Sequence, residues 1–177
     1  MKRETSRHVA IMDYGRNGTN GGWPRQYREP PRALLGDTMG GESDMADAAG
    51  NEHNKELVRR IVEHMFNQGK LEVASEIFAP DFVDRGHEQV GGKQDGPDGF
   101  AQFVRAVRSA LPDLQASIQS LVAEGDYVAM WNSATATHVG ELFGIPGSGK
   151  RIAMKDFHFF RFANGKIVEH WNQVGFV

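Results

Sequence analysis

Residues 155–172 read KDFHFFRFANGKIVEHWN, and this stretch decides how the rest of the chain is interpreted. Aromatic and β-branched residues fill both halves, and the dipeptide Asn-Gly between them is the strongest short-range signal of a β-hairpin. The same stretch carries four polar side chains that are unusual for strands: Asp156, His158, His170 and Asn172. We therefore expect whatever chemistry the protein performs to lie in this hairpin.

The turn of the hairpin decides which polar side chains meet. A two-residue turn would place His158 opposite Trp171. A three-residue loop ending in a glycine bulge would place His158 opposite His170 and Asp156 opposite Asn172. We favour the second register because it gathers the polar side chains on one face of the sheet. That face would also carry Phe160, Val168 and Val174, and the other face would carry Phe157, Phe159 and Trp171.

Composition narrows the class of protein. The chain has 177 residues, of which 40% are hydrophobic and 24% charged, as in ordinary globular domains. Its formal net charge is -3 with scattered basic residues, which predicts neither a nucleic-acid partner nor an anionic membrane. Cysteine is absent, which excludes disulfides and thiol chemistry. No apolar run approaches the roughly 20 residues of a membrane span, and no secretory signal is visible, so we expect a cytoplasmic protein.

The first 50 residues differ from the remainder. Glycine and proline break every periodicity there, and the apolar residues are isolated, so this segment cannot bury enough apolar surface to offset its ordering entropy. We predict a disordered or poorly ordered extension over residues 1–50 and one domain over residues 51–177. Met45 could begin a chain of its own, and we hypothesise that the residues before it reflect the choice of start site.

The domain divides into a helical part and a strand-rich part. Apolar periodicity predicts one helix from Glu52 to about residue 67, a short one over 71–78, and a third that begins at Asp98 or Gly99. Strands are predicted at 82–83, 114–123, 127–139 and 151–177, with a glycine-rich loop over 140–149. This order indicates an α+β fold. A curved antiparallel sheet would wrap around the helices and leave a conical pocket.

Several short strings reinforce this layout. They are FNQG (66–69), APDFV (79–83), GPDGF (96–100), LPDL (111–114), EGD (124–126), THVGE (137–141), GIP (144–146) and the FRF…NGKIVEHW hairpin. Over residues 52–177 their order resembles the SnoaL-like family of polyketide (ester) cyclases, which have the nuclear-transport-factor-two-like fold. The resemblance implies a buried apolar pocket and an acid–base residue just after Glu-His-Trp. That residue assists an intramolecular aldol condensation without metal or organic cofactor.

The sequence departs from the family at this acid–base position. Asn172 stands there, and a carboxamide cannot exchange a proton near neutral pH. The resemblance matches His158 to an upstream histidine of the family's site. We therefore take His158, Asp156 and His170 as the candidate catalytic residues. The alternatives are a pair of hydrogen-bonded structural histidines and a metal site completed by His138, although no metal-binding spacing is present and we expect no metal.

Other residues are candidates for ligand binding. Asn172 could donate a hydrogen bond to a carbonyl or enolate, or be a structural amide. Trp131, Phe160 and Trp171 could form the pocket wall, and His87 could line its entrance together with neighbouring polar residues. The loop 144–150 lacks the spacing of a phosphate-binding loop and is more typical of a lip on the pocket.

Two functions remain open from the sequence. The first is a cofactor-independent enzyme that performs acid–base chemistry on an apolar, carbonyl-bearing small molecule. The second is a non-catalytic small-molecule-binding protein whose acid–base residue has been replaced by Asn172. Either is compatible with a homodimer formed through the exposed face of the sheet.

Overall fold

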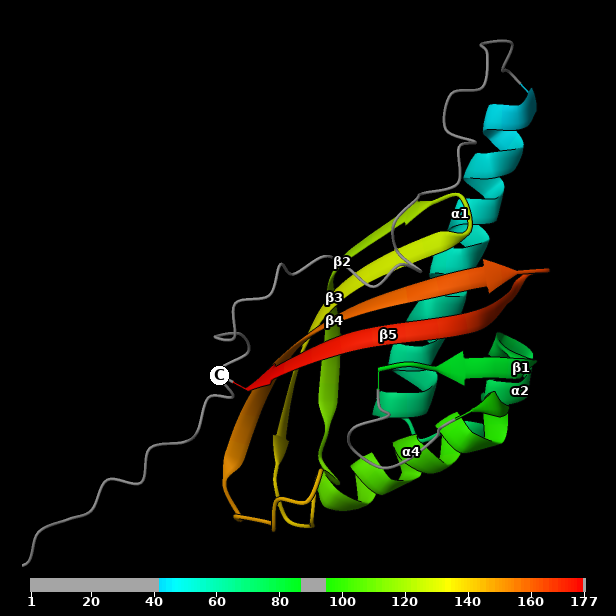
Figure 1. Cartoon of the computed structure of the whole chain (residues 1–177). Helices are drawn as coiled ribbons and strands as arrows, with labels where there is room; N and C mark the ends of the chain where they lie inside the picture. The colour runs from blue at the N-terminus through cyan, green and yellow to red at the C-terminus, as the bar shows by residue number, and fades with distance from the viewer. Residues whose placement is uncertain (1–41, 87–94, 177) are drawn as a thin grey trace, which may run out of the picture. The chain divides into compact units, whose positions relative to one another are not determined.

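The computed structural model describes residues 42–86 and 95–176. It has two layers, a strongly curved sheet and a set of helices packed in its concave side (Figure 1). The helices are α1 (Glu42–Arg60), continued by the π-helix η2 (Ile61–Asn67), the 3₁₀ turn η3 (Leu71–Val73), α2 (Ala74–Ile77) and α4 (Gly96–Ala110). The strands are β1 (Phe78–Asp84), β2 (Gln115–Glu124), β3 (Tyr127–Thr137), β4 (Arg151–Ala163) and β5 (Lys166–Phe176). The predicted α+β fold is confirmed.

The sheet has the strand order β1-β5-β4-β3-β2. β2, β3, β4 and β5 form an antiparallel meander, whereas β1 joins β5 in parallel at the other edge. This parallel pairing is possible because α4 and three strands separate β1 from β5 along the chain. Among the described residues, no helix is long and apolar enough to cross a membrane.

The helices follow the predicted apolar faces but not all the predicted bounds. α1 begins at Glu42, ahead of the expected start, and its apolar stripe continues through η2 into the core. The helix ends at Asn67, as predicted, and Gly69 follows it with a φ of +73°, which suits glycine. α4 begins at Gly96 with Asp95 as its N-cap, ahead of the predicted start, because Pro97 is well tolerated in a first helical turn.

A cluster of aromatic rings joins α4 to the β1 edge of the sheet. Phe78 lies between Phe82 and Phe100, with ring centroids 4.5 and 4.6 Å away. All three rings are buried, and His170 on β5 contacts Phe100 edge-on at 6.0 Å. Burying such a side chain contributes about 1.5–3 kcal/mol to the free energy of unfolding. The cluster therefore fixes the position of β1 and of Asp84, its last residue.

The opposite edge of the sheet is held by a side chain of η2. Asn67 donates from Nδ2 to the carbonyl of Ala116 at 3.0 Å and accepts from the Ala116 amide at 2.8 Å. Asn67 thereby satisfies the backbone groups that β2, an edge strand, would otherwise leave without a partner strand. Arg108 of α4 donates to the carbonyls of Phe66 and Asn67, so η2, α4 and β2 are fastened together around one end of the interior.

The register of the β4–β5 hairpin differs from both predicted registers. Near the tip, Ala163 pairs with Lys166 across a two-residue turn, in which Asn164 and Gly165 both have positive φ (52° and 71°). This is the geometry of a type I′ turn. A bulge at Val168 then shifts the ladder by one residue.

Beyond the bulge, the pairs are Phe160 with His170, His158 with Asn172 and Asp156 with Val174. The favoured register, with His158 opposite His170 and Asp156 opposite Asn172, is therefore wrong. The predicted division into faces is right for the polar residues, because the bulge restores the alternation that the tighter turn would have reversed.

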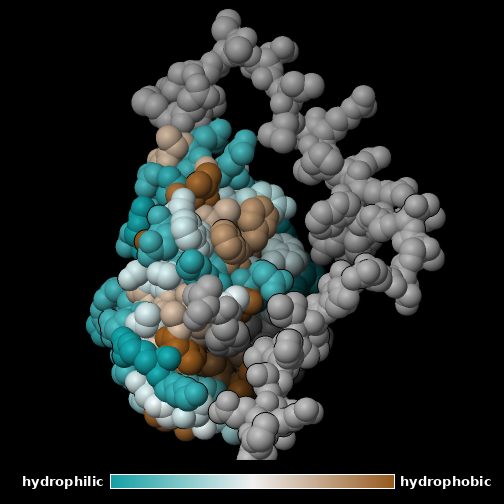
Figure 2. All heavy atoms as spheres, turned by 90° about the vertical axis from the view of Figure 1, so that its left-hand side faces the viewer, coloured by the Kyte–Doolittle hydropathy of each residue, from teal (hydrophilic) through white to brown (hydrophobic). Residues whose placement is uncertain are grey.

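The outer face of the sheet is unusually aromatic. Trp131 stacks on Phe157 at 6.0 Å and Tyr127 on Phe159 at 5.2 Å, and Phe159 also contacts Trp171. Phe157 is 59% exposed and Phe159 44% exposed. Figure 2 shows brown and tan side chains reaching the surface among hydrophilic ones on the side of the molecule that faces left in Figure 1.

Candidate functional site

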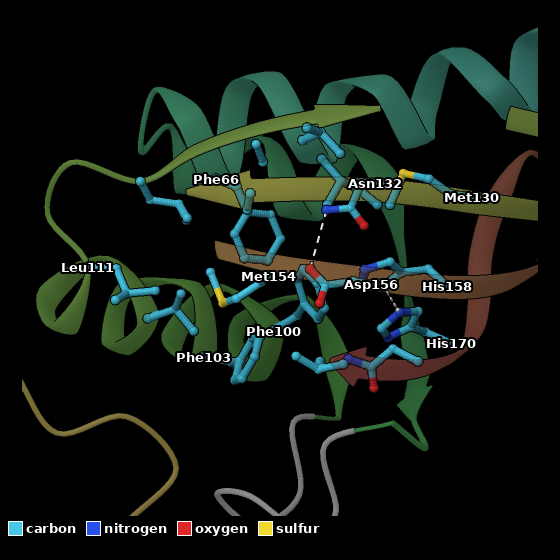
Figure 3. Close-up of a pocket in the computed structure, with 18 of the residues that line it drawn as sticks. Phe66, Phe100, Phe103, Leu111, Met130, Asn132, Met154, Asp156, His158 and His170 are labelled. Carbon is cyan, nitrogen blue, oxygen red and sulfur yellow. Dashed lines mark hydrogen bonds between the residues drawn. The ribbon is translucent and has the colours of Figure 1, made fainter. Parts of the chain in front are cut away.

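A mostly apolar cavity lies between the inner face of the sheet and the helices η2 and α4 (Figure 3). Its wall includes Val62, Phe66, Phe103, Met130, Met154 and Phe160. The cavity volume is about 70 Å³, within an empty space of about 710 Å³ that includes the opening to solvent. The buried apolar pocket that the resemblance implies is therefore present, and it is narrow.

Two histidines meet at the β4–β5 side of this cavity. Nδ1 of His158 lies 2.9 Å from Nε2 of His170, and the two rings are nearly parallel at 15°. They are diagonal neighbours in the ladder, because His158 is opposite Asn172 and His170 is opposite Phe160. His170 is 1% exposed and stacks on Phe160 at 4.7 Å, so its ring orientation is fixed by packing as well as by hydrogen bonds.

A buried carboxylate extends this pair to a third strand. Oδ1 of Asp84 lies 3.2 Å from Nδ1 of His170, and Asp84 is 1% exposed. The amide of Gly86 donates to the same oxygen at 2.9 Å. Asp84 is one of the polar residues near His87 that were expected at the pocket entrance, whereas the parallel pairing of β1 with β5 buries it beside His170. Asp84 is the site residue whose position the sequence did not reveal.

The row Asp84–His170–His158 has a definite proton arrangement when Asp84 is ionised and both imidazoles are neutral. A carboxylate only accepts, so His170 donates from Nδ1 and its Nε2 becomes an acceptor. His158 then donates from Nδ1, which leaves Nε2 as its basic nitrogen. This tautomer is assigned from the hydrogen-bond network. The arrangement equips His158 to take a proton while the resulting positive charge is stabilised from behind.

A second polar pair lies on the same inner face, between β3 and β4. Asn132 is directly opposite Asp156 in the ladder, and its Nδ2 donates to Asp156 Oδ2 at 3.4 Å, a long hydrogen bond. Both residues are buried, at 5% and 9% exposure. From the sequence, Asp156 was a candidate catalytic residue together with His158 and His170. In the structure the carboxylate beside the histidine pair is Asp84, and Asp156 contacts Asn132.

Asn172 lines the cavity opposite His158. The chain that leaves β1 passes directly against it: a Cβ built on Gly86 would lie 2.0 Å from Asn172 Oδ1 and 2.7 Å from its backbone nitrogen. The absence of a side chain at Gly86 therefore lets the β1 end approach β5 closely enough for Asp84 to reach His170. Asn172 sits beside that junction.

The remaining candidate residues fall into three groups. Phe160 lines the cavity, as expected. Trp131 and Trp171 do not line it, because they lie on the outer face of the sheet, where they border a shallow concavity with Phe157. His87 lies outside the described residues.

The loop predicted to form a lip contributes to the cavity through its first part. Leu142 and Phe143 line the wall, and Phe143 stacks on Phe103 of α4 at 6.2 Å and 11°. Phe143 has a φ of 52°, which is uncommon for a residue with a side chain. Packing against α4 holds the ring in place over the cavity.

The metal-site alternative needed His138 near the two histidines. Met130 is opposite His158 in the ladder, and His138 lies eight residues further along, roughly 26 Å at the rise of a strand. Within residues 42–86 and 95–176, no three His, Asp or Glu side chains gather as ligands of a metal ion would. His138 is therefore not part of this site.

Next to the histidine pair, Glu169 ties three strands together. It accepts hydrogen bonds from Arg85, which follows β1, and from Arg161 on β4. Burial raises the pKa of the Glu169 carboxyl, but the hydrogen bonds and charges of the two arginines outweigh burial and hold the pKa below its usual value. Glu169 faces outward, so it supports the site without entering the cavity.

The chain belongs to the SnoaL-like polyketide cyclase family, whose model matches residues 56–176. It is 30% identical over 117 residues to the aklanonic acid methyl ester cyclase DauD of Streptomyces sp. (strain C5), covering 65% of this chain and 71% of that protein. It is also 30% identical over 107 residues to the nogalonic acid methyl ester cyclase of Streptomyces nogalater, covering 59% and 78%.

Solved structures agree with this family membership. Wild-type IdmH from Streptomyces antibioticus superposes with a TM-score of 0.59 at 30% identity, over 68% of this chain and 91% of that one. A SnoaL-like protein from Jannaschia superposes with a TM-score of 0.63 at 23% identity, over 70% and 86%. At that lower identity the likeness concerns the fold alone.

Proposed function

We propose that the protein is a cofactor-independent enzyme that transfers protons to and from an apolar, carbonyl-bearing small molecule held in the cavity. The observation that supports this most strongly is the row Asp84–His170–His158, which joins three strands within hydrogen-bonding distance. A general base needs a partner that fixes its tautomer and stabilises its charge, and His170 with Asp84 supplies both for His158.

The side chains take distinct roles in this proposal. Nε2 of His158 removes a proton from the carbon next to a substrate carbonyl. Asn172, opposite His158, donates a hydrogen bond from its amide to the enolate oxygen that develops. When the carbanion attacks a second carbonyl and closes a ring, the protonated His158 returns the proton to the new alkoxide. These reaction steps need no carboxylate at position 172.

The relatives supply the substrate class. Their names refer to methyl esters of aklanonic and nogalonic acid, and we extend to this chain the closure of a ring in a polyketide ester. The narrow cavity favours a substrate smaller than the whole empty space, or requires the wall to move when a large one binds.

A non-catalytic binding protein is the second candidate. The observation in its favour is Asn172, which lines the cavity at the position where the family resemblance leads us to expect the acid–base residue. Under this alternative the row of three residues is a structural network that orders β1, β4 and β5.

Hydrogen–deuterium exchange distinguishes the two candidates without the natural substrate. The probe is 1-tetralone, a small apolar ketone, and NMR in D₂O measures the loss of its α-hydrogens. We expect the protein to accelerate this exchange and His158→Ala to lower the protein-dependent rate about 10²–10⁴-fold. The matched control is His53→Ala, an exposed histidine on α1 outside the cavity, which should leave the rate unchanged. Exchange no faster than in buffer, or exchange untouched by His158→Ala, contradicts the enzyme proposal.

We further propose a homodimer that buries the outer face of the sheet. The support is the run of exposed aromatic side chains on β3 and β4, which includes Trp131, Phe157 and Phe159. Exposed apolar patches of this kind mark interfaces, and a two-fold axis lets one patch bury its own copy. Sedimentation should give a dimer at micromolar concentration, and Phe157→Lys should shift it toward monomer; a parent that sediments as a monomer contradicts this arrangement.

A further inference from the structure

The carbonyl oxygen of the Asn132 side chain is a buried polar atom at the cavity wall. Asn132 is 5% exposed, and within the described part of the chain its Oδ1 has no hydrogen-bond partner. The residues two positions away on the same face are Met130 and Ala134, which also line the cavity and offer no donor side chain. A buried acceptor in such surroundings is an unusual feature that calls for a partner.

The orientation of the amide follows from its neighbour. Nδ2 of Asn132 points to Asp156 Oδ2, as Figure 3 shows. The reversed amide would place two acceptor oxygens together if Asp156 is ionised, so the observed orientation is the favourable one. Because Nδ2 is turned to the carboxylate, Oδ1 is presented to a different partner, and a partner for Oδ1 must be a donor.

We infer that Asn132 is a recognition site for a hydroxyl group of the ligand. An alcoholic, phenolic or enolic hydroxyl would donate to Asn132 Oδ1, with the Asp156 carboxylate beside it. The inference rests on the proposed function in one respect, since it assumes that the same cavity holds the ligand. Cavities of this type combine an apolar wall with a few polar groups that fix the orientation of the ligand, and Asn132 is such a group.

The position of Asn132 also limits where the hydroxyl can be. Its ladder partner Asp156 is two residues from His158 on the same face of β4, a separation of about 6.6 Å along the strand. One six-membered ring with its substituents covers a comparable span. The ligand should therefore carry its hydroxyl across one ring from the carbon at which His158 acts.

Binding of matched ketones tests this. The probes are 1-tetralone and its hydroxylated isomers with the hydroxyl at different positions of the aromatic ring, measured by calorimetry on the full chain. We expect at least one isomer to bind about tenfold more tightly than 1-tetralone, the gain typical of one neutral hydrogen bond in a buried site. In Asn132→Leu, which has a similar volume and no amide, this ratio should fall to about one, while 1-tetralone still binds.

Met154→Leu is the matched control. Met154 lines the same wall, two residues from Asp156 on β4, so its replacement changes the shape of the cavity without touching a polar group. The hydroxyl preference should persist in Met154→Leu. If Asn132→Leu does not fold, the ranking of the isomers by the parent protein still decides the matter, because the inference requires a preference among them.

The outcomes separate this inference from the proposed function. Equal affinity of the parent for 1-tetralone and every isomer overturns the inference even if α-hydrogen exchange occurs. A preference that survives in Asn132→Leu overturns the assignment to Asn132. A hydroxyl preference without any exchange overturns the proposed enzyme function alone. A parent that binds none of the ketones overturns both.

Discussion

Oδ1 of Asp84 and Nδ1 of His170 lie 3.2 Å apart although 86 residues separate them in the chain. The contact exists because β1 pairs in parallel with β5, which sets the last residue of β1 directly beside His170. It gives His170 one acceptor, and His170 then holds His158 at 2.9 Å. The acid–base proposal therefore depends on the β1 edge as much as on the hairpin.

Asp84→Asn tests whether this contact positions the base. An amide beside His170 Nδ1 can donate, which would reverse the tautomer of His170 and remove the charge behind His158. We expect the protein-dependent exchange of 1-tetralone to fall about 10²–10⁴-fold, as when the carboxylate of a catalytic triad is replaced. If Asp84 had a purely structural role, Asp84→Asn would leave the pH profile of exchange unchanged. An unchanged profile therefore contradicts the proposal that Asp84 sets the tautomer and charge of the histidine pair. Nitrogen NMR of the imidazoles reports the tautomer directly.

Asn172→Asp tests the departure from the family. If Asn172 donates to the enolate oxygen, a carboxylate there removes a donor and places a negative charge beside a developing one. We expect slower exchange, by about 10²-fold. Asn172→Ser, which keeps a donor, should lose less. A variant that acquires activity where the parent has none supports the binding-only alternative instead.

Gly86→Ala tests the close approach between the β1 end and β5. Its new Cβ would lie 2.0 Å from Asn172 Oδ1 and 2.7 Å from the Asn172 backbone, so the two segments must separate. We expect a loss of about 1–3 kcal/mol in the free energy of unfolding, measured with urea. Gly50→Ala, in the interior of α1 with nothing within 4 Å, is the matched control. It should stabilise the protein by about 0.5–1 kcal/mol.

The Glu169 carboxylate predicts a pH dependence of stability. Its pKa in the folded state is held below the usual 4.5, where burial alone would raise it, by the hydrogen bonds from Arg85 and Arg161. Because the pKa of Glu169 is lower in the folded state than in the unfolded state, its ionised carboxylate stabilises the folded protein. This stabilisation is fully present above the unfolded-state pKa and is lost as the pH falls through the folded-state pKa. Urea unfolding should therefore show a loss below about pH 4.5. Glu169→Gln should be less stable at pH 7 and show a smaller loss on acidification; an identical acid profile for parent and variant would contradict this.

Much of the fold could be predicted because its signals are local. The apolar period of α1 and α4, the Asn-Gly turn and the alternation along β3 and β4 each specify their own element. The side-chain faces of the hairpin were predictable for the same reason. The register could not be predicted, because a bulge such as the one at Val168 has no characteristic composition. From the sequence, a pairing shifted by one residue could not be distinguished from the correct pairing.

The candidate site was less accessible from the sequence because it is assembled from distant segments. His158, Asp156 and His170 lie in one hairpin and could be singled out together. Asp84 could not, since nothing local shows that its strand runs parallel to β5. Asn132 did have a signal: in the alternation of β3 it occupies a buried position between Met130 and Ala134, where a polar residue is unexpected. The outward orientation of Trp131 follows from the same alternation.

The bulge at Val168 has a consequence for how this hairpin can be changed. Continued without it, the pairing at the tip would bring Glu169 and Trp171 to the cavity and turn His170 and Asn172 to the outer face. The extra residue at the bulge therefore allows the hairpin to have a two-residue turn and still direct His170 and Asn172 toward the cavity. Residue exchanges in the tip and in the site can be made independently as long as this count is preserved. A single-residue insertion in β5 between the tip and the site would turn His170 and Asn172 to the outer face of the sheet, although the composition of the chain would hardly change.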